Sequence, residues 1–181
     1  MQFFIMLVIF VFYVYINHNK FSKESKIAWN ILLELNYTKE SAYSLIAILD
    51  EYTNLNPFYV DKNLLEEEIN FTDPASYINQ DIKIDESFLD EIPLGINKFI
   101  SSEEKKFLKK LALEKNKGIF DLQIQLQTLD YFQKNENLSI IDNIDEAVRN
   151  YIEKFYQNLT EQKYNIVNKA HEYYEFFKNK N

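Results

Sequence analysis

Glycine and proline are scarce in this chain: two glycines and three prolines occur among its 181 residues. Sandwiches and barrels of β-strands need many tight turns, and glycine and proline supply the backbone conformations of those turns. Helices joined by short polar loops need far fewer of them. Because 46% of the residues are apolar, the chain can form a packed core. We therefore predict a single domain that is a mainly α-helical bundle.

The longest apolar stretch covers residues 3–16, with the sequence FFIMLVIFVFYVYI. As a helix this stretch would be about 21 Å long, against ~30 Å for the hydrocarbon core of a bilayer. We interpret residues 1–20 as an uncleaved membrane anchor, with Tyr13 and Tyr15 near the headgroups. Three lysines follow the stretch at positions 20, 23 and 26, whereas only the α-amine precedes it. The positive-inside rule then places the helical domain of residues 21–181 in the cytoplasm.

Two other interpretations of the apolar stretch stay open. A cleaved signal peptide would make this an exported or surface protein, but it requires a basic start and small residues before the cleavage site. Here the start is Met-Gln, and the first alanine after the stretch is Ala28. Alternatively the stretch is a buried segment of the core, since ten or so consecutive apolar residues fit a core helix or strand.

Helical spacing of apolar residues predicts the first two helices of the domain. The first covers residues 23–35 and stops at Asn36. The second follows Thr38 as its N-cap and runs to about Thr53. A connection of two or three residues between amphipathic helices predicts an antiparallel helical hairpin.

Residues 58–97 are less regular. Asp61 and Asp73 are candidate helix starts, and the alternation of DIKID at 81–85 is typical of a short strand. Ten acidic residues and two lysines between positions 61 and 91 give this part a charge of −8, which equals the net charge of the whole chain. We expect a solvated surface here, because most charge runs have no other role.

Ser101 and Glu104 fit the S-x-x-E capping box, which predicts the start of another helix. We expect this helix to reach about Asn116, with Gly118 as its left-handed stop. Residues 119–133 fit the spacing of a strand as well as that of a helix. The length of the segment and its glutamine-rich polar positions favour a helix.

On the helix that starts after Ser101, four lysines are expected to lie opposite the apolar face: Lys105, Lys106, Lys109 and Lys110. A face of this kind can contact anionic lipid or an acidic partner, including the acidic segment of the same chain. The simpler interpretation is a solvated face. Nucleic-acid binding is not expected, because no strong basic patch is interleaved with stacking aromatic residues.

The strongest periodic pattern lies in residues 141–177, where apolar residues recur every three or four positions. It is typical of one long heptad-like helix, or of two helices with Thr160 as the cap of the second. The apolar stripe serves either the core of its own domain or a partner helix, including one from a second copy. Aromatic residues near its end spread widely around the helix and are candidate partner-binding residues: Tyr173, Tyr174, Phe176 and Phe177. Docking of this helix on its own domain is the simpler interpretation.

No enzyme or cofactor motif is recognisable. Gly95 and Gly118 are the only glycines, so the glycine-rich loops that wrap phosphates or dinucleotides are absent. The two histidines, His18 and His171, match neither the E-x-x-H nor the H-x-x-x-H metal motif, and the chain has no cysteine. We therefore expect no cofactor and no metal.

The leading hypothesis is a noncatalytic, membrane-anchored subunit that binds or scaffolds other proteins of a membrane-associated assembly. It rests on the apolar stretch, the long C-terminal pattern and the lack of catalytic motifs. The alternative from another class is an enzyme with an unrecognised carboxylate site in residues 61–97, where paired carboxylates are common because the segment is so acidic.

Overall fold

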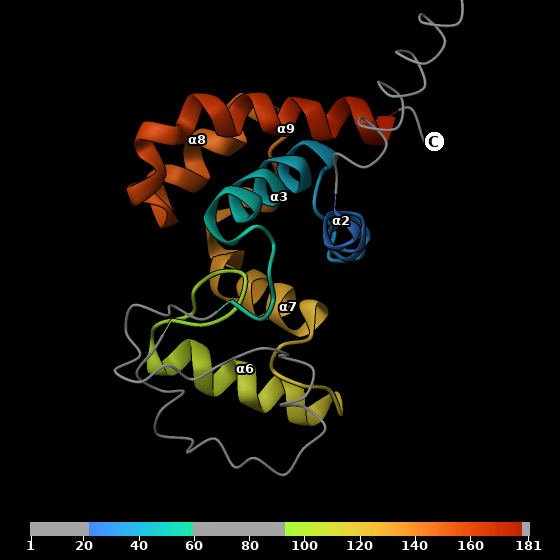
Figure 1. Ribbon diagram of the computed structural model, residues 1–181, viewed down its shortest axis with the longest axis vertical. Coiled ribbons are helices and arrows are strands. Elements are labelled where there is room, and N and C mark those ends of the chain that lie inside the picture. The colour runs from blue at the N-terminus through green and yellow to red at the C-terminus, as the bar shows by residue number, and fades with distance from the viewer. Residues whose placement is uncertain (1–21, 60–92, 179–181) are drawn as a thin grey trace, which may run out of the picture.

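The computed structural model describes residues 22–59 and 93–178, so the predicted anchor and the elements predicted within 60–92 lie outside the described residues. Six α-helices and no strand occur in the described ranges, which confirms the prediction of a mainly α-helical fold (Figure 1). The helices are α2 (Lys23–Glu34), α3 (Lys39–Thr53), α6 (Ser102–Glu114), α7 (Leu122–Gln133), α8 (Ile144–Phe155) and α9 (Lys163–Lys178). The short 3-10 helices are η2 (Lys134–Glu136), η3 (Leu138–Ile140) and η4 (Gln157–Gln162). None of the helices in these ranges has both the length and the apolar character needed to cross a bilayer.

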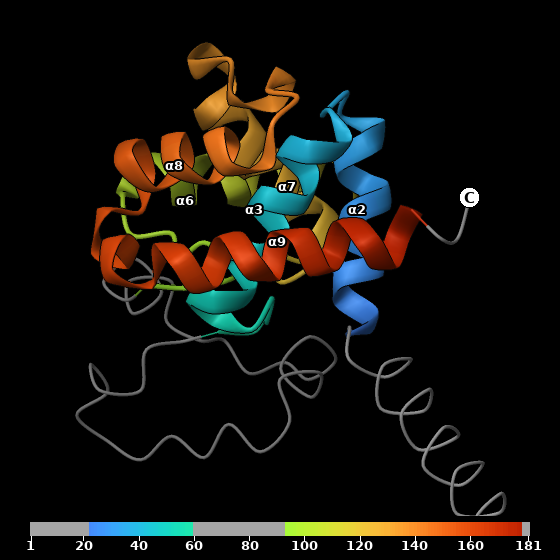
Figure 2. The same cartoon turned by 90° about the horizontal axis from the view of Figure 1, so that it is seen from above.

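Helices α2 and α3 form the predicted hairpin. Ser22 Oγ accepts the Ser25 backbone N–H at 3.0 Å, and Thr38 Oγ1 accepts the Ser41 N–H at 3.2 Å, so each helix begins at a side-chain cap. Between them Asn36 has a left-handed conformation, with φ 66°. α3 then runs back beside α2, inclined to it (Figure 2). The predicted stop at Asn36 and cap at Thr38 are confirmed.

Helix α3 is the central helix of the bundle. All residues from 41 to 49 are buried, and α2, α8 and α9 pack around them (Figure 2). A helix that is buried all round must also pair its polar side chains. The Ser41 hydroxyl donates to the Leu138 carbonyl at 2.6 Å, and the Ser44 hydroxyl donates to the Glu40 carbonyl at 2.8 Å. The first of these bonds ties the centre of the bundle to η3.

Helices α6 and α7 form a second pair below the hairpin (Figure 1). The capping box of Ser101 and Glu104 is present in both directions, and the predicted helix at 119–133 is confirmed as α7. The predicted stop at Gly118 is wrong. Asn116 is the left-handed residue, with φ 52°, because the Lys117 N–H bonds back to the Ala112 carbonyl and ends α6 two residues earlier.

The C-terminal pattern forms two helices and not one. α8 ends at Phe155, Tyr156 leaves the helical conformation (φ −129°, ψ 42°), and η4 leads into α9. The predicted cap at Thr160 is also wrong, because its hydroxyl donates to the Gln157 carbonyl within η4. The apolar stripe of α9 is buried in its own domain through Ile166, Ala170, Tyr173 and Phe177.

Polar contacts also join α9 to α3. Lys169 Nζ lies 3.1 Å from Glu51 Oε2 and 3.3 Å from Asp50 Oδ2, and the Tyr173 hydroxyl donates to Asp50 Oδ2 at 3.1 Å. Burial disfavours the Lys169 ammonium, but the two carboxylates outweigh burial and raise the pKa of Lys169. These contacts hold α9 across α3 with its apolar stripe inward.

Candidate functional site

The loop of residues 94–99, which joins the described segment at Pro93 to α6, is the centre of the candidate site. Leu94 and Phe99 exchange backbone hydrogen bonds of 3.3 and 2.8 Å, and these bonds close the loop. The apolar residues of the loop are buried: Leu94, Ile96 and Phe99. Asn97 and Lys98 therefore stand at its tip, where both are partly exposed.

Two buried polar side chains hold the 94–99 loop in place. Gln125 on α7 accepts the Ile96 N–H at 2.9 Å through Oε1, and its Nε2 donates to the carbonyls of Pro57 and Ile119 at 2.8 and 2.9 Å. Thr53, at the end of α3, donates to the Ile96 carbonyl at 2.8 Å. These hydrogen bonds hold the loop against the ends of two helices through buried side chains.

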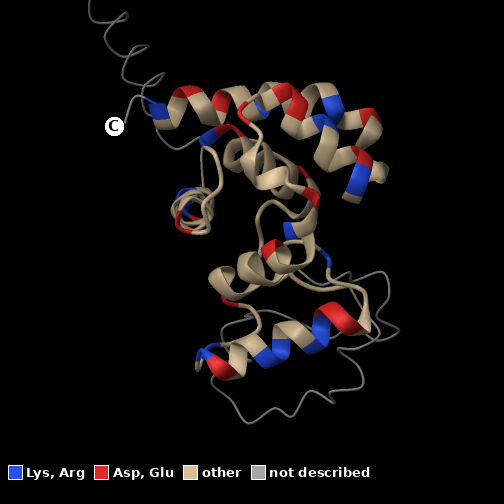
Figure 3. Ribbon diagram, turned by 180° about the vertical axis from the view of Figure 1, so that it is seen from behind, with Lys and Arg blue, Asp and Glu red and all other residues tan. Residues whose placement is uncertain are grey.

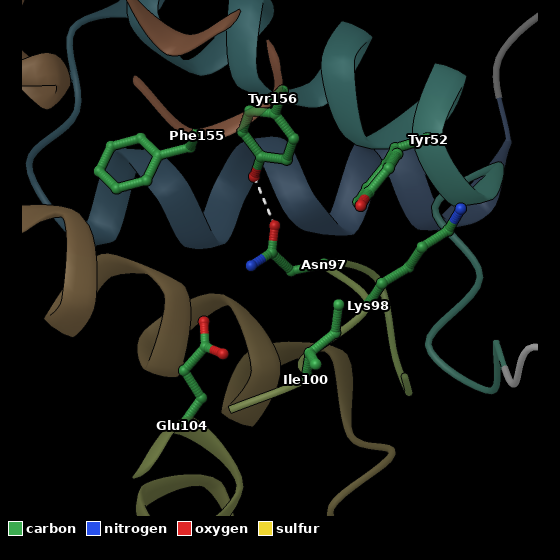
Figure 4. Close-up of a pocket in the computed structure, with 7 residues that line it drawn as sticks. All are labelled: Tyr52, Asn97, Lys98, Ile100, Glu104, Phe155 and Tyr156. Carbon is green, nitrogen blue, oxygen red and sulfur yellow. Dashed lines mark hydrogen bonds between the residues drawn. The ribbon is translucent and has the colours of Figure 1, made fainter. Parts of the chain in front are cut away.

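The loop forms one wall of a hollow of about 180 Å³ (Figure 4). The lining residues are Tyr52, Asn97, Lys98, Ile100, Glu104, Phe155 and Tyr156. They come from the end of α3, from the loop, from the start of α6 and from the end of α8. Pockets for small molecules usually enclose ~300–1,000 Å³. The hollow is therefore smaller than a usual cofactor site and has room for little more than one side chain.

Hydrogen bonds and ring contacts hold the polar groups of the hollow. The buried Tyr156 hydroxyl donates to Asn97 Oδ1 at 2.6 Å. The Lys98 ammonium lies 4.3 Å from the centroid of the Tyr52 ring and 4.9 Å from that of the Tyr59 ring. Two aromatic faces thus stabilise the cation, and Figure 4 shows it turned away from the space beside Tyr156.

Two apolar side chains flank the hollow. Ile100 is 61% exposed and Phe155 is 41% exposed, which is high for large apolar residues. Glu104 lies beside them, and its Oε2 accepts the Ser101 N–H at 3.1 Å as part of the capping box. In Figure 4 the amide nitrogen of Asn97 points toward the part of the hollow where Phe155 and Glu104 lie. A hydrogen-bond donor on Asn97 and an acceptor on Glu104 therefore lie next to exposed apolar surface.

The lining of the hollow combines hydrogen-bonding groups with aromatic and apolar side chains. No serine, cysteine or histidine lines it, so it offers none of the common nucleophile and base pairs. Burial raises the pKa of Tyr156 and that of Tyr52, so both phenols stay protonated at neutral pH. His171 lies elsewhere, with Nε2 2.8 Å from Asp145 Oδ1 on the surface. Within the described ranges no three His, Cys, Asp or Glu residues form a group that could hold a metal ion.

The structure places the predicted partner-binding aromatic residues away from this hollow, at the C-terminal end of α9 (Figure 1). Tyr173 and Phe177 are buried, and the Phe177 ring stacks on Trp29 of α2 with 4.8 Å between centroids. Tyr174 and Phe176 are partly exposed beside them. The first two residues therefore belong to the core of their own domain, and only the second two contribute surface.

Figure 3 shows the lysines of α6 as blue stretches along the helix. The four lysines predicted on one face do not all face solvent. Lys105 is 1% exposed and lies on the same face as the buried Leu108 and Ala112. Lys105 is therefore not part of a solvated face, because helical spacing turns positions 105, 108 and 112 to one side. The other lysines stay at the surface, fully or in part: Lys106, Lys109 and Lys110.

No protein-family model matches the chain, and comparisons with curated proteins and with solved structures yield no match either. The lining of the hollow was also not identified from the sequence. Tyr52 and Phe155 fit the apolar stripes of two predicted helices, so nothing distinguishes them from core residues. The one local signal is the turn sequence Pro93-Leu94-Gly95, which is separated from Asn97 and Lys98 by a single residue.

The domain should lose stability when the pH rises above about 10, the usual pKa of a phenol. Burial is the largest cause that raises the pKa of these tyrosines: Tyr37, Tyr43, Tyr52, Tyr151, Tyr156 and Tyr173. Because the folded chain holds these protons more tightly than the unfolded chain, the stabilisation is present below the unfolded-state pKa and is lost as the pH rises toward the folded-state value.

Urea unfolding followed by circular dichroism at increasing pH checks this expectation. The midpoint should fall steeply above about pH 10, and tyrosinate absorbance should appear together with the loss of helix. Ionisation of all the tyrosines in a chain that keeps its full helix content would contradict it.

Proposed function

We propose that this chain is a membrane-anchored, noncatalytic helical protein whose domain binds another protein, as an accessory or scaffold subunit of a membrane-associated assembly. The observation that carries the proposal is the hollow beside the 94–99 loop, because Ile100 and Phe155 expose apolar surface at its mouth. In this proposal residues 3–16 supply the anchor, and the domain lies on the cytoplasmic side.

The chemistry of the hollow resembles the centre of a protein interface. Such centres combine a few aromatic or aliphatic anchors with a small number of polar groups, and the anchors fill pockets on the partner. Here Ile100 and Phe155 are the apolar contacts, while the Asn97 amide and the Glu104 carboxylate supply a donor and an acceptor. A volume of about 180 Å³ suits one inserted side chain of the partner.

The hydrogen bonds that fix the lining of the hollow also favour binding. The Tyr156 hydroxyl holds the Asn97 amide, and Gln125 holds the backbone next to it. Groups that are already ordered lose little conformational entropy when a partner binds, so more of the contact energy appears as affinity.

Affinity capture of the tagged full chain from its native cells tests the proposal. The double variant Ile100→Ala with Phe155→Ala should retain several-fold less of a specifically bound protein than the unchanged chain, because truncation of central apolar anchors weakens binding most. Tyr164→Ala is the matched control, because Tyr164 is 76% exposed on α9 and lies outside the lining. The same cells test the anchor: the chain should stay with membranes after carbonate washing, with its C-terminus protected from protease added outside.

Two results would overturn the proposed function. One is the recovery of no partner by a chain that is shown to be monomeric. The other is a full-length chain that is soluble after cell breakage. Circular dichroism of each variant separates lost binding from lost fold, since Ile100 and Phe155 are exposed and their truncation leaves the core intact.

A further inference from the structure

Helices α2 and α9 meet at one corner of the domain (Figures 1 and 2). Trp29 of α2 and Phe177 of α9 stack with 4.8 Å between ring centroids and 5° between ring planes. This contact is buried, so it holds the C-terminal turn of α9 against the middle of α2. We name the surface around it the α2–α9 corner. Its residues are Lys26, Tyr174, Phe176 and Lys178.

Lysine side chains cover aromatic rings at the α2–α9 corner. Lys26 Nζ lies 5.6 Å from the centroid of the Phe176 ring, and Lys178 Nζ lies 5.2 Å from that of the Tyr174 ring. All four side chains reach the surface, at least in part. Aromatic rings with a polar edge and lysines with long apolar stems are the side chains that accumulate at the headgroup level of membranes.

The start of α2 also determines where a preceding anchor must lie. Ser22 caps α2, and the apolar stretch ends at Ile16, six residues earlier. Six residues span at most roughly 20 Å when fully extended. If residues 3–16 lie in the hydrocarbon core, then Ser22 lies no more than about 20 Å from it, and the headgroup region itself fills about 5–8 Å of that distance. With an anchor at residues 3–16, the start of α2, which leads into the corner, is therefore held close to the lipid.

The opposite side of the domain carries the hollow. In Figure 1 the ends of α3 and α8 and the start of α6, which line the hollow, lie on the far side from the junction of α2 with the C-terminal turn of α9. A domain that rests on the membrane by its α2–α9 corner therefore keeps the hollow open to the cytoplasm. The surface lysines of α6 also lie away from this corner.

We infer that the α2–α9 corner lies against the headgroup layer of a phospholipid bilayer, an inference that rests on the anchor of the proposed function. Tyr174 and Phe176 enter the headgroup layer, and Lys26 and Lys178 reach lipid phosphates. Glu24 and Glu175 lie on the same helical turns. The contact therefore depends on where the lysine and aromatic side chains reach, and not on a large net charge.

Single fluorescent labels on the full chain test this orientation, because the chain has no cysteine of its own. Glu175→Cys places a label beside the corner, and Tyr164→Cys places one on the same exposed face of α9, eleven residues earlier. The two positions are roughly 16 Å apart along the helix axis. The chain is incorporated into vesicles of phosphatidylcholine and phosphatidylglycerol that contain a headgroup-nitroxide lipid, and the quenching of each label is measured.

The label at position 175 should be quenched several-fold more strongly than the label at position 164. The double substitution Lys26→Glu with Lys178→Glu should reduce this difference, whereas the control Lys106→Glu on α6 should leave it unchanged. Equal quenching at both positions in a chain that floats with the vesicles overturns the inference and leaves the anchor standing. A chain that does not float with the vesicles overturns both the anchor and the inference.

Discussion

Replacement of Gln125 by leucine is expected to lower the free energy of unfolding by roughly 3 kcal/mol or more, since each buried peptide group left without a partner costs about 1–3 kcal/mol. Leucine keeps most of the side-chain volume but cannot bond the Ile96 N–H or the carbonyls of Pro57 and Ile119. Urea unfolding measures the change. Gln127→Leu is the matched control on the same helix, because Gln127 is only partly buried. Equal small losses in the two variants would contradict the assigned role of Gln125.

A second substitution tests whether Gln125 and the loop act as one unit. A Cβ at Gly95 would lie 2.7 Å from Gln125 Oε1, and the φ of +74° disfavours any side chain there. Gly95→Ala should therefore displace the same amide. In a Gln125→Ala background, Gly95→Ala should lower the free energy of unfolding by less than it does in the unchanged chain. The Gln125 amide is absent there, so only the backbone strain at position 95 remains. Additive losses would mean that the two residues do not interact.

Replacement of Trp29 by alanine should cost about 3–5 kcal/mol, the usual range for truncation of a large buried aromatic residue. Trp29 stacks on Phe177 of α9 at 4.8 Å and on Tyr43 of α3 at 6.2 Å, so one side chain joins three helices. Thermal unfolding measures the loss. Amide hydrogen exchange should also show that the C-terminal turns of α9 lose protection first, since their docking on α2 depends on this ring.

Two further variants test whether the Trp29 ring itself causes the expected loss of stability. Trp29→Phe keeps an aromatic ring in the stack and should cost less than Trp29→Ala. Ile27→Ala changes an exposed residue of the same helix and should change stability by less than about 0.5 kcal/mol, as surface substitutions usually do. A Trp29→Ala variant as stable as Ile27→Ala would show that the stack does not hold α9.

The elements that the sequence predicted correctly depend on neighbours in the chain. Thr38 bonds the N–H three residues later, and Ser101 and Glu104 bond each other across the same spacing. Such caps are local, so the residue pattern alone identifies them. The same holds for the helical spacing that predicted α2, α3 and α7.

The predicted helix ends were wrong where two local conformations are both possible. Asn116 and Gly118 are both able to adopt a left-handed conformation. The hydrogen bond from the Lys117 N–H to the Ala112 carbonyl places that conformation at Asn116. The apolar stripe stays in phase across Tyr156, so its spacing shows no break there. The chain turns at Tyr156 because its ring packs on Tyr52 and its hydroxyl bonds Asn97, and both partners are distant in the sequence.

The helical class, most helix starts and stops, and the absence of glycine-rich phosphate loops follow from the sequence alone, because they depend on composition and on residues within one or two turns of each other. Three further outcomes required the three-dimensional structure. The C-terminal stripe is divided between two helices and packs into the core of its own domain, and Lys105 is buried. Residues from α3, the 94–99 loop, α6 and α8 form one hollow. These outcomes depend on contacts between residues up to about a hundred positions apart, such as that of Tyr52 with Tyr156. Periodicity along the chain predicts which face of a helix is apolar, but it does not predict which other segment packs against that face.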